Sequence, residues 1–134
     1  MTQRAWIEAL QEEKITVMVG GIMTHQSYIR SEGGYIDDDC VSEIYNLAVN
    51  CGVSDFVVPG NKPGIIRSLK QELETMNISP VFYSPGFITQ GGSIEDAMEA
   101  SDGNLHAFVG RALYEADNIH TAAVNLCSQL KVDI

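Results

Sequence analysis

Short apolar runs alternate along the chain with longer segments whose apolar residues recur at helical spacing. The short runs are rich in β-branched and aromatic residues, which favours strands; they cover residues 15–19, 55–58, 80–83 and 105–109. The longer segments predict helices over residues 2–13, 37–52, 63–76, from 93 onward, 111–115 and 118–130. Because every strand is followed by a helix, the order predicts parallel βα units with right-handed crossovers.

Four such units are half of an eight-unit barrel, which typically has about 250 residues. We therefore predict an α/β fold: half of a TIM (β/α)8 barrel, with four parallel strands each followed by a helix and one helix in front. Residues 1–134 are expected to form a single half-barrel domain. The irregular segment 20–35 is long for a connection, which favours a functional or mobile loop.

Several helix ends carry recognisable start and stop residues. Thr2 and Ser93 are suited to cap helices, and Pro63 is suited to a first helical position. Asp37 to Asp39 suit the positive end of the second helix, which Gly52 ends. The buried face of the first helix is expected to consist of Ala5, Trp6, Ala9 and Leu10.

The composition excludes several classes of protein. With 134 residues the chain has room for one core, and its net charge of −10 argues against nucleic acid and anionic membranes as partners. No apolar run approaches the roughly 18 residues of a membrane span, and the N-terminus lacks the core of a signal peptide. The three cysteines show no CxxC spacing, so we expect buried free thiols and a cytoplasmic protein.

Candidate anion-binding chemistry follows the third and fourth predicted strands. The stretch Ser84–Gly92 contains Gly86, Gly91 and Gly92, and such glycines let a backbone approach an anion closely. Gln90 can donate an amide hydrogen bond, and the guanidinium of Arg111 matches two phosphate oxygens. The alternative is that the glycines are turn formers, that Gln90 is an ordinary loop residue and that Arg111 is a surface arginine.

Four segments together resemble orotidine 5'-phosphate decarboxylase of the archaeal type, the lyase that makes UMP from OMP. They are Met23-Thr24-His25, Asp55-Phe56-Val57-Val58-Pro59-Gly60, Ser84-Pro85-Gly86 with Gln90-Gly91-Gly92, and Val109-Gly110-Arg111 with Tyr114 behind it. Their order and spacing cover about residues 14–130 and resemble the C-terminal half of that barrel.

The resemblance implies roles for the matching positions. The 5'-phosphate would be held by Gln90, Gly91, Gly92, Gly110 and Arg111. Thr24 and Pro85 would meet the base and ribose. The segment from Gly20 to Gly34 would be a mobile lid after the fifth strand of the family's barrel. For Thr24 and His25 the alternative is a solvated loop.

One departure from the family bears directly on activity. The family's catalytic lysine and aspartates stand in an Asp-x-Lys-x-x-Asp motif, which does not occur here: the lysines are Lys14, Lys62, Lys70 and Lys131. We therefore assign no catalytic residue and expect no decarboxylation by this chain alone. The reaction forms a carbanion that needs a positioned cation and a proton donor, and Arg111 would be occupied by phosphate.

Three functional classes remain open. The chain is half of a decarboxylase that is active only when complemented, a non-catalytic phosphate- or nucleotide-binding module, or an oligomerising half-barrel scaffold. The expected partners are an OMP- or UMP-like nucleotide, and either further copies of the chain or a complementary N-terminal half-barrel, because a half-barrel leaves strand edges unpaired. We expect no cofactor, and the three histidines show no metal-ligand spacing, so no metal site is predicted.

Overall fold

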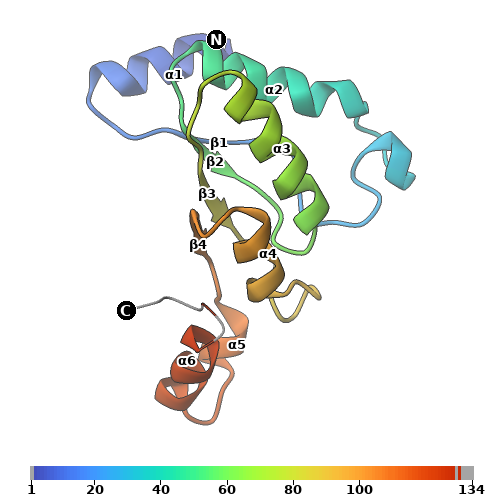
Figure 1. Ribbon diagram of the computed structural model, residues 1–134, viewed down its shortest axis with the longest axis vertical. Helices are drawn as coiled ribbons and strands as arrows, with labels where there is room; N and C mark the ends of the chain where they lie inside the picture. Colours follow the sequence, from blue (N-terminus) through green and yellow to red (C-terminus); the bar gives the residue numbers. More distant parts are fainter. Residues whose placement is uncertain (1, 129, 131–134) are drawn as a thin grey trace.

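The computed structural model describes residues 2–128 and 130, and its centre is one sheet of four parallel strands. The strands lie side by side in the order in which the chain makes them (Figure 1). Their bounds are Met18–Gly20 for β1, Asp55–Val57 for β2, Val81–Ser84 for β3 and Leu105–Ala107 for β4. The predicted α/β class, with parallel strands and a helix ahead of the first one, is confirmed.

Helices cover one face of this sheet. Figure 1 shows α2, α3 and α4 on the same side of the strands, with α1 beside α2. The pair formed by α5 and α6 follows β4 and extends away from the other helices. The helix bounds are Gln3–Glu12 for α1, Asp38–Asn50 for α2, Pro63–Thr75 for α3, Ile94–Ala100 for α4, Arg111–Tyr114 for α5 and Ile119–Cys127 for α6, and a 3-10 turn, η1, covers Arg30–Glu32.

The strand register separates the two faces. Val19, Phe56, Phe82 and Leu105 are aligned across the sheet, and all four are buried in the core beneath the helices. Side chains alternate between faces along a strand, so the neighbours of these residues point to the opposite face. There Met18 is 47% exposed, and Phe108, just beyond β4, is 49% exposed.

Most helix boundaries follow from the capping residues. The side chains of Thr2 and Ser93 accept hydrogen bonds from backbone amides of their first helical turns, and Asp37 does the same ahead of α2. Pro63 occupies the start of α3. The helix beginnings predicted from the sequence are therefore confirmed at these positions.

The predicted buried face of the first helix is wrong. The residue of α1 that enters the core is Ile7, which is 3% exposed, whereas Trp6 is 56% exposed. Ala9 is exposed, and Ala5 and Leu10 are half-buried. The helix packs along its Ile7 side because only a narrow stripe contacts the core.

The expectation of buried thiols is also wrong: Cys40 and Cys127 are exposed and Cys51 is half-buried. Cys40 lies in the first turn of α2, and Cys127, the last residue of α6, lines an apolar pocket with Ala107 and Val109 but stays exposed. Within the described residues, no helix is both long and apolar enough to cross a membrane.

Candidate functional site

The candidate residues all lie just after strands, at one edge of the sheet. Because the strands are parallel, their carboxyl ends meet at the same edge, and the loops after β1, β2, β3 and β4 are neighbours there. Thr24 follows β1, Pro85 and Gln90 follow β3, and Arg111 follows β4. The structure thus places the predicted residues on three of the four loops.

Two glycines allow the loops to approach one another closely. A Cβ atom on Gly92 would lie 2.5 Å from the carbonyl oxygen of Gly86 and 2.9 Å from that of Gly60. A Cβ atom on Gly86, whose φ is +100°, would lie 2.6 Å from Cγ2 of Thr24 and 3.0 Å from Oε1 of Gln90. Side chains at these positions would separate the loops, so the glycines bring Thr24 and Gln90 together.

The glycine loop itself is a closed turn with a strained residue. The amide of Ile88 donates to the carbonyl of Gly92 at 3.1 Å, and the amide of Gly91 donates back to Ile88 at 3.1 Å. Ile88 has a φ of +64°, a region that β-branched residues rarely enter. Such strain persists only where the surroundings impose it, and it is concentrated at ligand sites.

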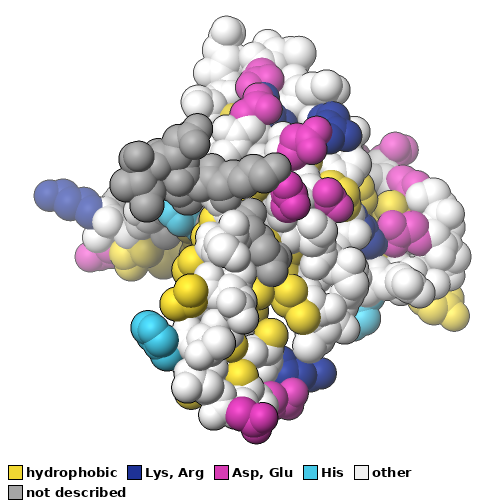
Figure 2. Space-filling model, turned by 60° about the horizontal axis from the view of Figure 1, so that its bottom comes forward, with side chains coloured by type: hydrophobic (Ala, Val, Ile, Leu, Met, Phe, Trp, Pro, Cys, Tyr) yellow, Lys and Arg dark blue, Asp and Glu magenta, His cyan; other side chains and the backbone are white. Residues whose placement is uncertain are grey.

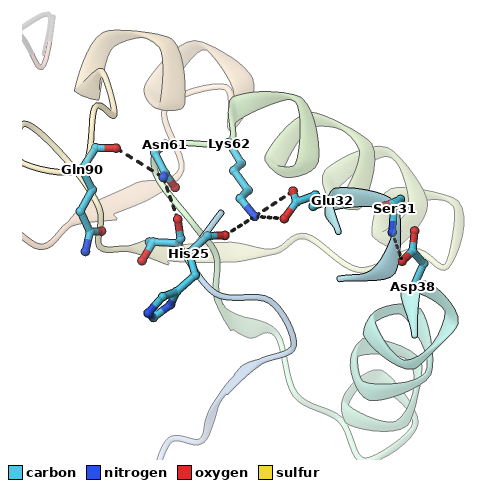
Figure 3. A network of polar contacts seen from close by, with 8 residues as sticks. His25, Ser31, Glu32, Asp38, Asn61, Lys62 and Gln90 are labelled. Atoms are coloured by element: carbon cyan, nitrogen blue, oxygen red, sulfur yellow. Dashed lines mark hydrogen bonds and ion pairs between the residues drawn. The ribbon is translucent and has the colours of Figure 1, made fainter. Parts of the chain in front are cut away.

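Asn61, on the loop after β2, joins the loops on either side. Its Nδ2 donates to the carbonyl oxygen of Thr24 at 2.9 Å and to that of Gln90 at 3.4 Å (Figure 3). Its Oδ1 is buried without a hydrogen-bond partner among the described residues. Sequence reasoning missed Asn61, because an Asn in a Pro-Gly turn looks like an ordinary turn residue.

Lys62, the next residue, fastens the long loop after β1. Its Nζ lies 2.8 Å and 2.7 Å from the two carboxylate oxygens of Glu32 and 3.0 Å from the carbonyl oxygen of His25 (Figure 3). The Lys62 side chain is only 13% exposed. This cation is therefore engaged in holding the 20–35 segment; the predicted mobility of that segment stays a prediction.

The same segment is also tied down at its far end. The amide of Ser31 donates to Oδ1 of Asp38 at 3.1 Å (Figure 3). The amide of Arg30 donates to the carbonyl of Ile36 at 2.8 Å. Hydrogen bonding to Ser31 lowers the pKa of Asp38. A chain of polar contacts thus runs from Gln90 through Asn61 and Lys62 to the start of α2.

Arg111 stands apart from these contacts. It begins the four-residue helix α5, directly after Gly110, and its side chain is 61% exposed. Its Nε lies 4.0 Å from Oε1 of Glu115, at the limit of an ion pair. Hydrogen bonding to Tyr114 raises the pKa of Arg111, so the guanidinium stays charged. Within the described residues, no hydrogen bond joins Arg111 to Gln90.

The arrangement can present donors to an anion from two sides. The Gln90 side-chain amide lies on the glycine loop, and the first backbone amides of α5 with the Arg111 guanidinium follow the neighbouring strand. Fixed amide donors and a planar cation are the groups that proteins use to hold phosphate. Pro85 is fixed beside them, because its carbonyl accepts the amide of Gly60 at 2.8 Å.

Sequence matches to curated proteins support the resemblance that the motifs suggested. The chain is 32% identical over 89 residues to the orotidine 5'-phosphate decarboxylase of Methanococcoides burtonii, which covers 66% of this chain and 39% of that protein. It is 28% identical over 120 residues to the enzyme of Thermoplasma acidophilum, covering 90% of this chain and 49% of that protein. The resemblance to archaeal decarboxylases is thus confirmed, but the chain spans less than half the length of these relatives. No family model matches the chain.

Solved structures show the same fold. The orotidine 5'-monophosphate decarboxylase of Sulfolobus solfataricus superposes with a TM-score of 0.74 at 23% identity, over 93% of this chain and 53% of that one. The enzyme of Methanocaldococcus jannaschii complexed with the inhibitor BMP gives a TM-score of 0.74 at 22% identity, over 93% and 54%. The fold therefore matches about half of these TIM-barrel decarboxylases.

Proposed function

We propose that this chain is the nucleotide-binding half of a barrel of the orotidine 5'-phosphate decarboxylase type, equivalent to its last four βα units and forming one half-barrel domain. Its ligand is an OMP- or UMP-like nucleotide, held through the 5'-phosphate. The observation that carries the proposal is the set of mutually tied loops at one sheet edge, with Gln90 and Arg111 as donors on neighbouring loops.

Each proposed contact has a physical reason. Gln90 offers a side-chain amide donor on the turn that Gly91 and Gly92 shape, and Gly110 with Arg111 offers backbone amides and a permanent cation. Thr24 and Pro85 lie beside the glycine loop, where a sugar or base attached to that phosphate would extend. We place the protein in the cytoplasm, where nucleotide synthesis takes place.

Catalysis is assigned to a complemented barrel rather than to this chain alone. The Asp-x-Lys-x-x-Asp motif is absent from the sequence, and Lys62 is engaged with Glu32. A developing carbanion needs a cation and a proton donor near the reacting carbon. Supplying a half-barrel that carries that motif should therefore produce decarboxylation, and neither half should do so alone.

The first experiment is a calorimetric titration of the chain with UMP, with uridine as the control. Measurable binding of UMP and none of uridine supports a phosphate-binding site formed by these loops. Equal binding of the two would contradict it, because the phosphate would contribute nothing. Binding of neither would favour the alternative of an oligomerising scaffold whose loops hold no ligand.

A further inference from the structure

Ile88, in the glycine loop after β3, has a backbone conformation that isoleucine rarely adopts. The described residues other than glycine that have a positive φ are Lys14, Ser27, Asn77, Ile88 and Asp102. Lys14, Asn77 and Asp102 each follow the end of a helix, where a left-handed residue is common. Ile88 follows no helix, and it alone in this group is β-branched, which makes the left-handed conformation most costly.

The rest of the glycine loop imposes this conformation on Ile88. Phe87, the residue before it, is 4% exposed, and its ring fills the space beside Gly60, where a Cβ atom would lie 2.5 Å from the ring. On the other side, the amide of Ile88 donates to the carbonyl of Gly92, and the carbonyl of Ile88 accepts from the amide of Gly91. Ile88 is therefore held between a buried ring and a closed turn.

The Ile88 side chain gains no core burial in return for this strain. It is 44% exposed and is not part of the hydrophobic core. Figure 2 shows hydrophobic side chains at the surface of the end of the molecule where α5 and α6 lie, so exposure alone does not distinguish Ile88. The combination of exposure with strain does. A glycine here would relieve the strain with little loss of packing, as Gly86 and Gly91 do at φ of +100° and +81°.

We propose that Ile88 is a ligand-contact residue, whose side chain packs on the sugar and base of the nucleotide that Gln90 holds by its phosphate. Backbone strain without a gain in packing is typical of residues with a functional role. Ile88 lies two residues before Gln90 on the same loop, so it brings an apolar side chain close to the phosphate donor. This inference rests on the proposed function and adds to it a preference for nucleotides over free phosphate.

The charge of the chain gives such a contact a purpose. The net charge of −10 opposes the approach of any anion, so Gln90 and Arg111 have to hold a phosphate against that field. An apolar contact does not depend on this field, and its contribution grows with the apolar area that the ligand covers. A nucleotide therefore gains from Ile88 a contact that inorganic phosphate is too small and too polar to make.

The test measures both stability and binding in the variant Ile88→Gly. Removing the strain should raise the melting temperature of the unliganded chain by about 3 °C. Losing the apolar contact should weaken UMP binding about tenfold in calorimetry. The affinity for inorganic phosphate, measured by its competition with UMP, should not change. A purely structural role of Ile88 would change the melting temperature and leave the UMP affinity as it is, which would overturn the proposal.

Two control variants separate the side chain from the backbone. Ile88→Val keeps a β-branched apolar side chain and should keep the UMP affinity within about twofold. Lys14→Gly replaces another left-handed residue, which lies before β1 at the opposite edge of the sheet, and should leave the UMP affinity unchanged.

Two further outcomes would overturn the proposal. An equal loss of affinity for UMP and for inorganic phosphate in Ile88→Gly would show that the loop backbone, and not the side chain, is responsible. A lower melting temperature of this variant would show that Ile88 is not strained. If the parent chain binds no UMP, the proposed function itself fails and the ligand contact fails with it, whereas a parent that binds UMP as tightly as Ile88→Gly contradicts the ligand contact alone.

Discussion

The loops after β1, β2 and β3 and the loop after β4 are built differently, although all four end at the same sheet edge. The first three are tied by Asn61, by Lys62 and by glycines too close to their neighbours to accept a side chain. The fourth carries Arg111 on a single turn of helix, with 61% of its side chain exposed and one ion pair at 4.0 Å.

The two kinds of loop would contribute differently to the proposed phosphate-binding site. The backbone that carries Gln90 is held in place before a ligand arrives, so less ordering entropy opposes a contact from this residue. The guanidinium of Arg111 must be ordered by the ligand, but it brings a full charge. Changes that break the ties between these loops should therefore reduce stability, and changes at Arg111 should reduce binding alone.

The largest effect is expected for Gly92→Ala. Its Cβ atom would meet backbone oxygens of two other loops, which cannot move independently, so we expect a loss of about 3 kcal/mol in the free energy of unfolding. Urea unfolding measures it. Gly64→Ala in α3 is the control: its Cβ meets nothing within 4 Å, and a gain of up to about 1 kcal/mol is expected. Equal effects at both positions would contradict the close packing of the loops.

Arg111→Ala should leave unfolding within about 0.5 kcal/mol of the parent. Binding of UMP should weaken by about 1.5–3 kcal/mol, because one charge-assisted contact is lost. Calorimetry measures the second quantity. The control is Arg67→Ala, which removes an equally exposed arginine paired with Glu99 at 3.9 Å. An unchanged affinity for UMP in the Arg111 variant would refute the assignment of that residue.

Asn61→Ala should cost about 1–2 kcal/mol in unfolding free energy, because the carbonyls of Thr24 and Gln90 lose their shared donor. It should also weaken UMP binding, since Gln90 is no longer held. Asn50→Ala, at the exposed end of α2, serves as the control in the same measurements. If stability fell while UMP affinity stayed the same, Asn61 would hold the loops without positioning the ligand contact.

The smallest effect concerns alkaline pH and lies on the face of the sheet opposite the helices. The hydrogen bond to Asp55 raises the pKa of Tyr83 above its ordinary value of about 10. The folded state therefore holds this proton more tightly, and its contribution to stability is present below pH of about 10 and lost as the pH rises through the folded pKa. Phenolate absorbance should show that Asp55→Asn lowers this pKa, whereas Asp117→Asn does not. No change in Asp55→Asn would show that another group sets the pKa.

The sequence predicted local features better than contacts between distant segments. Thr2, Pro63 and Ser93 identify helix starts because a cap depends on residues within the same turn. The parallel sheet follows from the alternation of strands and helices. The choice of Ile7 over Trp6 depends on how α1 packs, which periodicity alone does not fix.

The candidate site shows the same limit. Gln90, Arg111 and the glycines could be named because they stand in recognisable stretches after strands. The role of Asn61 could not, because its partners lie 37 and 29 residues away in the chain. The pairing of Lys62 with Glu32 was missed for the same reason, since it spans 30 residues. Whether the named residues bind phosphate stays a prediction.

The sequential order of the strands has a consequence for how the molecule assembles in time. Each strand pairs with the one synthesised just before it, so every new βα unit finds its neighbour already present as the chain leaves the ribosome. Local contacts of this kind favour fast folding. Among the described strands, β1 and β4 each have one neighbour, and β4 leads into α5 and α6, which extend away from the other helices, so unfolding is expected to begin at this end.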